Sequence, residues 1–324
     1  MTINPVFTDA TPLSAVSSEE QFRDDVLVGL TAAQKFIPAK YFYDEVGSDL
    51  FEAITRQPEY YPTRTEIGIL DESGADIASL LPPRANLVEF GSGSTVKVRR
   101  LLVHLTDLAA YVPVDVSESF LRSEAETLSR DFPRLSIQPV AADFTRPFTL
   151  PDGLSNSAVA GFFPGSTIGN FEPPQAAHLL AHFGRVLGRG ASLVVGVDLV
   201  KDKSALDAAY DDAAGVTARF NINLLHRINR ELGADFDPSA FAHRAYFAPE
   251  ASRIEMHLVS LRAQQVSLAG RRFSFSEGET IHTENSYKYT VDGFRDLASQ
   301  AGWNVAKSWT DGERLFSVHA LTRG

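Results

Sequence analysis

Short apolar runs alternate with stretches of helical spacing through the middle of this 324-residue chain. The apolar run Leu87 to Phe90 stops at a glycine-rich turn, and the apolar positions of residues 96–105 then recur at helical intervals. The pattern continues with apolar runs at 110–114, 136–141, 158–163 and 192–197 and with helical spacing at 117–132 and 173–188. Strands and helices that alternate in this way predict a parallel, doubly wound α/β sheet with helices on both faces.

Two segments interrupt this alternation. Residues 1–62 are rich in aromatic side chains and contain no strand–glycine–helix unit. Residues 203–232 have the spacing of one long helix, and two segments with the pattern of antiparallel strands follow at 245–262 and 266–275. We therefore expect a sheet domain that is interrupted by an inserted α+β domain, with the N-terminal segment packed against the insertion.

The α/β pattern resumes near the C-terminus, with a predicted helix at 294–303 and predicted strands at 305–309 and 315–321. Two domains suit a chain of this length, since a domain takes roughly 150 residues. The predicted boundaries give a sheet domain of residues 63–200 plus 286–324 and a second domain of residues 1–62 plus 201–285.

Composition narrows the class of protein. Hydrophobic residues make up 44% and charged residues 22%, which is typical of a globular protein. The chain has no cysteine, which excludes disulfides, thiolate nucleophiles and cysteine-bound metal clusters. A formal net charge of −11 argues against binding to nucleic acid or to an anionic membrane. The N-terminus does not resemble a signal peptide, and no apolar run is long enough to span a membrane, so we expect a cytoplasmic location.

A Gly-x-Gly turn between a strand and a helix is the first candidate site. Such a turn directs backbone N–H groups and a positive helix end at one spot, where cofactors bind. A dinucleotide fingerprint would continue with a third glycine, but Val96 occupies that position, which disfavours a nicotinamide dehydrogenase. Glu89, two residues before Gly91, fits the E-x-G-x-G pattern of methyltransferases better.

Two carboxylates end the next two predicted strands. Asp115 lies 22 residues after Gly93 and could accept hydrogen bonds from both ribose hydroxyls of a cofactor. Asp143 and Phe144 could receive the amino group and the face of an adenine. Each carboxylate alone is more often a cap or a solvated turn residue, but the ordered set of glycine turn and two carboxylates predicts an adenosine-type cofactor.

Several longer strings closely resemble the histidine N-alpha-methyltransferases of ergothioneine biosynthesis. The similarity covers nearly the whole chain from about residue 20 and is carried by residues 38–66, 88–97, 165–171, 198–202, 209–221, 253–256 and 283–289. The resemblance implies transfer of three methyl groups from S-adenosylmethionine to the alpha-amine of L-histidine, through the mono- and dimethylated intermediates, to give hercynine. It also implies a class I Rossmann-like methyltransferase sheet with a second domain that binds the substrate.

The resemblance assigns roles to matching positions of this sequence. It implies cofactor contacts for Gly91, Lys97, Asp115, Asp143 and Phe144. It places Tyr43 near the amine and Tyr60 at the boundary between substrate and cofactor. It places Asn170 and Tyr210 at the alpha-carboxylate and amine end, and Glu284 and Ser286 at the imidazole, with Met256 as a further substrate contact. We expect Tyr43, Tyr60 and Asn170 to be the catalytic residues.

Elementary geometry supports the imidazole pair. In a strand, residues i and i+2 share a face, so Glu284 and Ser286 should point together while Asn285 and Tyr287 point away. A carboxylate can accept a ring N–H, and a hydroxyl can donate to or accept from the other ring nitrogen. Without the resemblance, such a pair would most often be a solvated strand face.

The clustered tyrosines and Asn170 also have plain structural explanations. Tyr41, Tyr43, Tyr60 and Tyr61 lie within 21 residues, and packing alone would explain most of them. We expect one or two to be functional, since a ring face tolerates a growing trimethylammonium. Asn170 follows a glycine, where asparagine is most often a turn residue.

Other readings of the chain are weaker. His178 and His182 have helical i, i+4 spacing, but no third ligand is evident, so we expect no metal. A related N-methyltransferase acting on tryptophan or tyrosine is the nearest alternative. A regulatory protein that binds S-adenosylmethionine without catalysis would not need the acceptor-side residues Asn170, Tyr210 and Glu284. We expect a monomer whose partners are small molecules rather than nucleic acid or membrane.

Overall fold

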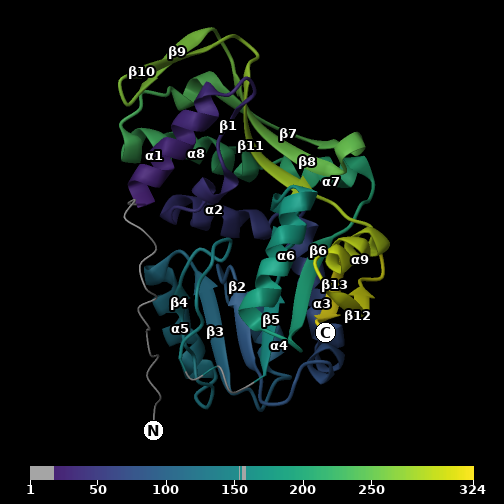
Figure 1. Ribbon diagram of the computed structural model, residues 1–324. Helices are drawn as coiled ribbons and strands as arrows, with labels where there is room; N and C mark the ends of the chain where they lie inside the picture. Colours follow the sequence, from purple (N-terminus) through teal and green to yellow (C-terminus); the bar gives the residue numbers. More distant parts are fainter. Residues whose placement is uncertain (1–17, 153, 155–157) are drawn as a thin grey trace. The chain divides into compact units, whose positions relative to one another are not determined.

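The computed structural model describes residues 18–152, 154 and 158–324, in two compact units. The first unit comprises Pro62–Leu199 and Tyr289–Gly324, and the second comprises residues 18–61 and Val200–Lys288 (Figure 1). The boundaries predicted after residues 62 and 200 differ from the observed ones by one residue each. The boundary predicted after residue 285 differs by three residues, so Ser286 lies in the second unit. The prediction that residues 1–17 belong to the second domain falls outside the described residues.

A seven-stranded sheet forms the centre of the first unit. In spatial order its strands are β12 (Asn304–Thr310), β13 (Phe316–Thr322), β6 (Ser192–Asp198), β5 (Val159–Phe163), β2 (Asn86–Phe90), β3 (Ala110–Asp115) and β4 (Val140–Ala141). The strands from β6 to β4 are parallel, as predicted, but β13 runs antiparallel to both β6 and β12. The α/β class is confirmed and the sheet is mixed, because the loop of Asp311 to Leu315 is too short for the crossover that parallel neighbours need.

Helices cover both faces of this sheet, which explains the apolar strands. One core cluster includes α6 (Pro173–Leu187) and α9 (Val291–Gln300), and the other includes α3 (Tyr61–Ser79), α4 (Val96–Leu102) and α5 (Glu118–Asp131). In the first cluster, the ring of Phe183 stacks on that of Phe90 with 3.8 Å between ring centroids. Every residue of β2 and of β6 is buried, as expected for parallel strands covered on both sides.

The strand predicted at 136–141 is shorter than expected. Only Val140 and Ala141 form β4, while Ile137 makes an isolated bridge to Tyr111. Pro139 interrupts the strand between them because it has no backbone N–H to donate to a neighbour.

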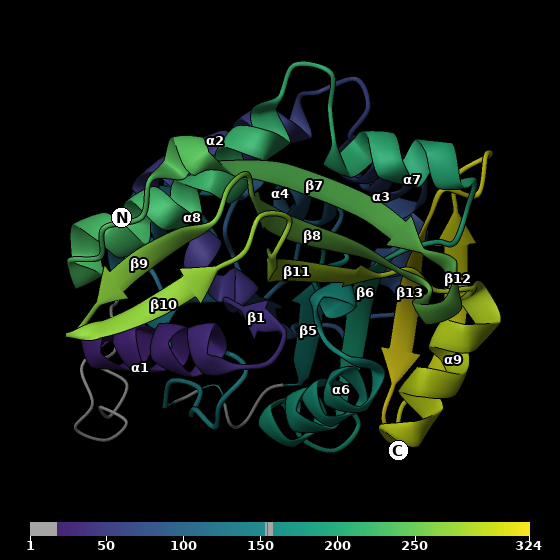
Figure 2. The ribbon, with the colours of Figure 1, turned by 90° about the horizontal axis from the view of Figure 1, so that it is seen from above.

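The second unit contains the predicted antiparallel strands (Figure 2). Its four-stranded sheet has the order β1 (Lys35–Phe36), β11 (Thr280–Tyr287), β8 (Arg253–Ser260) and β7 (Phe241–Ala248), and β9 (Gln264–Leu268) pairs separately with β10 (Arg271–Phe275). The helices are α1 (Ser18–Thr31), α2 (Glu45–Thr55), α7 (Lys203–Tyr210) and α8 (Val216–Leu232), with 3₁₀ turns η1 (Ala39–Phe42), η3 (Pro238–Ala240) and η4 (Pro249–Ala251). Among the described residues, no helix has the length and apolar character needed to cross a membrane.

The single helix predicted over residues 203–232 is wrong, since α7 and α8 are separate. The carboxylate of Asp212 accepts hydrogen bonds from the backbone N–H groups of Val216 and Thr217 at 2.8 and 2.7 Å. Gly215 has a φ of +66°, a conformation that glycine adopts readily. An aspartate that caps the first turn in this way starts a new helix and leaves Tyr210 at the end of α7.

Candidate functional site

In the first unit, the turn after β2 brings together two of the predicted cofactor residues. Gly91 has a φ of +75°, and a Cβ at this position would lie 3.2 Å from the Phe144 ring. A Cβ on Gly93 would meet no atom within 4 Å, so the turn has open space beside it. The backbone N–H groups of Gly91, Ser92 and Gly93 already donate to the carbonyl oxygens of Val114 and Gly91. What the turn offers a cofactor is open space beside it and the adjoining ring of Phe144.

Glu89 holds this turn in place from inside the sheet. It is 1% exposed and accepts hydrogen bonds from the Tyr111 hydroxyl and, at 3.2 Å, from the Ser92 hydroxyl. Burial raises the pKa of Glu89 to about 8, so its carboxyl group is largely protonated at neutral pH. Glu89 therefore links β2, the turn and β3 as a neutral hydrogen-bonding group.

The two strand-end carboxylates each stabilise their own turn. Asp115 accepts a hydrogen bond from the Ser117 backbone N–H at 3.1 Å, and burial raises the pKa of Asp115. Asp143 accepts hydrogen bonds from the backbone N–H and the hydroxyl of Thr145 at 2.9 and 2.5 Å and pairs with Arg146 at 3.4 Å. Both carboxylates therefore stabilise turns, which is the structural role that the sequence offered as the alternative to cofactor binding. These hydrogen bonds leave room for ligand contacts, because a carboxylate can accept about four hydrogen bonds.

Lys97 belongs to a second cluster, which forms around the carboxylate of Glu66. The sequence pattern gave no indication of this residue. Glu66 of α3 is fully buried and pairs with Lys97 Nζ at 2.7 Å. The two oxygens of Glu66 accept hydrogen bonds from the Gly165 backbone N–H at 3.1 and 2.9 Å. A Cβ on Gly165 would lie 3.1 Å from Lys97 Nζ, so Lys97 lies against the loop that leads to Asn170.

Asn170 ends the 3₁₀ helix η2 (Thr167–Asn170) and is partly buried. The preceding Ser166 has the left-handed backbone conformation, with a φ of +55°. Its hydroxyl oxygen accepts a hydrogen bond from the Asp198 backbone N–H at 2.9 Å, which ties the loop to the end of β6. The loop that carries Asn170 is thus fixed at the carboxyl ends of two sheet strands, where ligands of α/β sheets bind.

In the second unit, β11 carries the predicted imidazole pair. Glu284 lies opposite Met256 and Ser286 lies opposite Ile254 in the antiparallel register with β8. Residues opposite each other share a face, so Glu284, Ser286 and Met256 lie on the same side of the sheet. The register shifts between His282 and Glu284, where β11 has one residue more than its partner.

A buried lysine joins this group. Lys288 is 2% exposed and donates hydrogen bonds from Nζ to the Tyr210 hydroxyl at 2.9 Å and to the Ser286 hydroxyl at 2.8 Å. The hydroxyls of Tyr210 and Ser286 are themselves 2.8 Å apart. The structure therefore brings the predicted residues Tyr210 and Ser286 together through Lys288. Continuing the alternation from Glu284 and Ser286 by two residues would have indicated this lysine.

At neutral pH the carboxyl group of Glu284 is divided between its protonated and its ionised form. Burial raises the pKa of Glu284 to about 7, and the positive charge of Lys288 acts in the opposite direction. The carboxyl group is therefore close to its titration midpoint at neutral pH. A ligand that donates a hydrogen bond to it would favour the ionised form.

The two predicted tyrosines differ in their surroundings. Tyr60 is buried, and its ring lies 6.2 Å from the Tyr210 ring at an interplanar angle of 64°. Tyr43 is 44% exposed and packs edge-on against Phe51 and Phe220, with ring centroids 5.6 and 5.8 Å apart. Tyr60 is thus next to Tyr210, whereas Tyr43 belongs to a neighbouring aromatic cluster.

His178 and His182 do not form a ligand set. The ring of His178 lies at the surface with Nδ1 2.7 Å from the Pro174 carbonyl oxygen, and His182 packs near Phe148. In the part of the chain that the structure describes, the one group of three or more potential metal ligands is Glu255, His257 and His282.

Comparison with known proteins gives a consistent picture. A family model described as "Histidine-specific methyltransferase, SAM-dependent" matches residues 22–323. Histidine N-alpha-methyltransferase from Mycolicibacterium smegmatis is 43% identical over 316 residues, which cover 96% of this chain and 98% of the relative. Its counterpart from Mycobacterium tuberculosis is 43% identical over 296 residues, or 89% of this chain and 91% of the relative. Ergothioneine biosynthesis protein 1 from Neurospora crassa is 29% identical over 89% of this chain and 33% of the relative.

Proposed function

The chain belongs to the histidine-specific, S-adenosylmethionine-dependent methyltransferases, and from this premise we propose that it methylates the alpha-amine of L-histidine three times to give hercynine, a step in ergothioneine biosynthesis. The observation that carries the proposal is the buried, hydrogen-bonded group of Ser286, Tyr210 and Lys288, with the partly buried Glu284 on the same face of β11. A carboxyl group beside a hydroxyl suits the two ring nitrogens of an imidazole.

The hydrogen-bond donors and acceptors that each side chain carries assign a role to each member of this group. Lys288 has donors only, so it occupies acceptor sites on Ser286 and Tyr210 and leaves their hydroxyl protons for other acceptors. With the Tyr210 hydroxyl donating to Ser286, the Ser286 hydroxyl proton can be donated to a ring nitrogen. The carboxylate of Glu284 accepts the N–H of the other ring nitrogen. Met256, on the same face, supplies an apolar contact for the ring.

The alternative substrates satisfy this group less well. An indole or a phenol could donate one hydrogen bond to Glu284, but neither offers a second ring nitrogen to pair with Ser286. The Ser286 hydroxyl, which stays bonded to Lys288 and Tyr210, would then gain no hydrogen bond from the substrate, and the net contribution of such a bond is roughly 0.5–1.5 kcal/mol. Histidine is therefore favoured over tryptophan or tyrosine.

The first unit provides groups for the cofactor. When bound, S-adenosylmethionine supplies a methyl group activated by its sulfonium. We assign the Gly91 turn and Lys97 to its binding, Asp115 to the ribose hydroxyls, and Asp143 with Phe144 to the adenine. These assignments use an open turn, a strand-end carboxylate and the partly buried ring of Phe144 beside the turn, all in the first unit.

The chain's own catalytic task is to hold a neutral amine in line with the methyl group and to exclude water. Positioning of this kind can supply roughly 7–11 kcal/mol in favourable cases. We assign Asn170 and Tyr210 to the alpha-carboxylate and amine end, and Tyr43 and Tyr60 to the neighbourhood of the amine. The exposure of Tyr43 makes Tyr60 the better candidate of these two.

Several finer expectations accompany this function. We expect the mono- and dimethylated amino acids to serve as substrates as well, and the enzyme to act as a cytoplasmic monomer without a catalytic metal. Nucleic acid and membrane surfaces are not expected as partners of a chain with a net charge of −11.

One experiment tests the proposal directly. The protein is incubated with S-adenosylmethionine and, in separate reactions, with histidine, tryptophan or tyrosine, and product masses are followed over time. We expect histidine to gain one, two and then three methyl groups at its alpha-nitrogen. Unmodified histidine, or faster methylation of either other amino acid, would overturn the assignment.

A further inference from the structure

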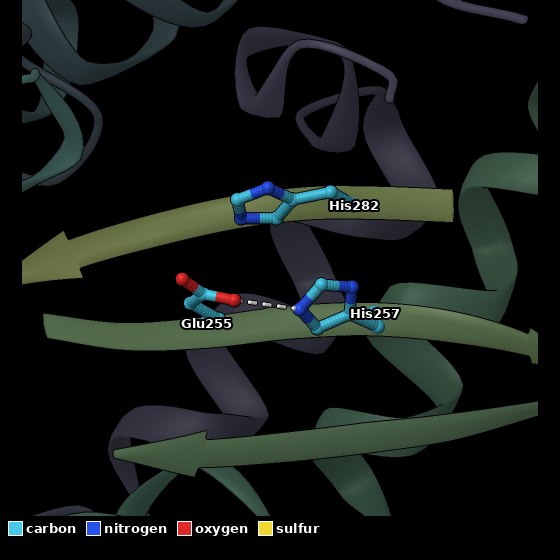
Figure 3. A group of neighbouring side chains, drawn as sticks. All are labelled: Glu255, His257 and His282. Carbon is cyan, nitrogen blue, oxygen red and sulfur yellow. Dashed lines mark hydrogen bonds and ion pairs between the residues drawn. The ribbon is translucent and has the colours of Figure 1, made fainter. Parts of the chain in front are cut away.

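The opposite face of β8 and β11 carries a second polar cluster, formed by Glu255 and His257 of β8 and His282 of β11 (Figure 3). His282 lies opposite His257, just as Glu284 lies opposite Met256. Met256 and His257 are consecutive in a strand and point to opposite faces, so their partners do as well. The cluster is therefore separated by the sheet from the face of Glu284 and Ser286.

Its donor atoms are closely grouped. Nε2 of His257 lies 3.0 Å from Oε2 of Glu255, and one ligand atom from each of the three residues lies within 4.8 Å of the others. The two imidazole rings stack with 4.7 Å between centroids. Figure 3 shows the three side chains on adjacent strands, with the rings side by side.

We propose that Glu255, His257 and His282 bind a divalent transition-metal ion, with Zn²⁺ as the expected ion. Two imidazoles and one carboxylate form a ligand set that suits zinc and leaves a fourth position open. Ligand atoms of a tetrahedral zinc site lie about 3.3 Å apart, given zinc–ligand distances of about 2.0–2.2 Å. Nε2 of His257 and Oε2 of Glu255 are 3.0 Å apart but share a hydrogen bond, so a metal that binds this nitrogen must displace its proton, and the His282 ring must turn toward the pair.

The cluster offers a carboxylate and two imidazole rings to a cation. Nδ1 of His257 is buried and makes no hydrogen bond within the described residues, so this ring has an unused nitrogen. The carboxylate of Glu255 accepts hydrogen bonds from Arg253, His257 and Tyr246 and supplies the negative charge of the cluster.

Existing contacts will limit the affinity. Arg253 donates two hydrogen bonds to Oε1 of Glu255 at 2.9 and 2.6 Å, and its charge repels a bound cation. The hydroxyl of Tyr246 donates to Oε2 at 2.9 Å and would have to yield this oxygen or share it. His282 Nε2 lies 3.0 Å from the Glu284 carbonyl oxygen, a contact that a metal would compete with if it bound this nitrogen.

The test uses tag-free, full-length protein stripped of metal with a chelator. Titration calorimetry with Zn²⁺ should show one equivalent bound, and Co²⁺ should give a visible absorption spectrum typical of nitrogen and oxygen ligands. Histidine is omitted from these titrations because it chelates both ions.

Variants identify the ligands. His257→Ala and Glu255→Gln should each weaken Zn²⁺ binding by at least about 100-fold, because loss of a ligand exceeds the 10–100-fold effect of removing an outer contact. His226→Ala, an exposed histidine of α8 in the same unit, is the matched control and should bind as the wild type does. His282→Ala provides a third ligand variant if either of the others fails to fold, as judged by circular dichroism. Absence of stoichiometric binding, or equal affinity in folded wild-type and ligand variants, would overturn the proposal.

Discussion

Replacing Lys288 with methionine tests whether the charge of this lysine controls the ionisation of Glu284 in the proposed imidazole pocket. The side chain is 2% exposed, and methionine has a similar length, so the change removes a charge and two hydrogen bonds with little loss of packing. Lys288 acts against the burial that raises the pKa of Glu284 to about 7. Without it, the pKa of Glu284 should rise further.

The magnitude follows from these two losses. In the wild type, Glu284 is mostly protonated below pH 7 and ionised above it, so histidine affinity should rise as the pH increases through about 7. Starting from a pKa of about 7, the first further unit lowers the ionised fraction at pH 7 about fivefold, and each unit after that lowers it about tenfold, or about 1.4 kcal/mol. Hydrogen bonds from a charged donor contribute roughly 1.5–3 kcal/mol. We therefore expect histidine affinity at pH 7 to fall by about 10- to 100-fold in Lys288→Met.

The assay is the Michaelis constant for histidine, and its binding by calorimetry, from about pH 6 to about pH 9. The rise in affinity should move to higher pH in Lys288→Met, while S-adenosylmethionine binding stays unchanged. Lys40→Met, in which a half-exposed lysine pairs with Asp25, is the control for loss of a lysine in the same unit.

A double variant separates this explanation from a structural one. If Lys288 acts through Glu284, the pH dependence caused by Glu284 should be absent in Glu284→Gln, and adding Lys288→Met should not restore or move it. A folded Lys288→Met protein with wild-type affinity and an unchanged pH profile would refute the reasoning.

Three other substitutions test the assigned roles. Glu284→Ala should weaken histidine binding by about 10- to 100-fold, since it removes a charge-assisted hydrogen bond, and leave cofactor binding nearly intact; an equal loss of both in calorimetry would contradict its role. Asn170→Ala should lower turnover as well as histidine affinity, because the amine is misplaced, and wild-type steady-state kinetics would count against this. Asp115→Ala should weaken S-adenosylmethionine binding by about 10-fold or more through loss of the ribose contacts, which unchanged calorimetric affinity would disprove.

The fold could be predicted where the spacing of apolar residues matches the repeat of a buried strand or a helix. Buried parallel strands read as continuous apolar runs, so β2 and β6 were found within one residue of their ends. The break between α7 and α8 was missed because apolar spacing continues across it, although Asp212 and Gly215 are a capping signal. The direction of β13 depends on the length of the preceding loop rather than on its own residues.

The candidate site was predictable only in part. Glu284 and Ser286 could be found because strand alternation and the family resemblance agree on them, and Lys288 follows from the same alternation. Glu66 carries no such signal. A glutamate in a helix normally faces solvent, and only the structure shows that Gly165 and Lys97 enclose this one.

The extra residue of β11 at Thr283 determines which changes in length this strand can accept. A chain that lacked this position would keep the side chains on both sides of it on their present faces, since the partner strand has no residue opposite it. Removing any residue between Glu284 and Lys288 would instead invert part of the strand. Alignments of related sequences should therefore tolerate a one-residue gap before Glu284 and keep the spacing from Glu284 to Lys288 constant.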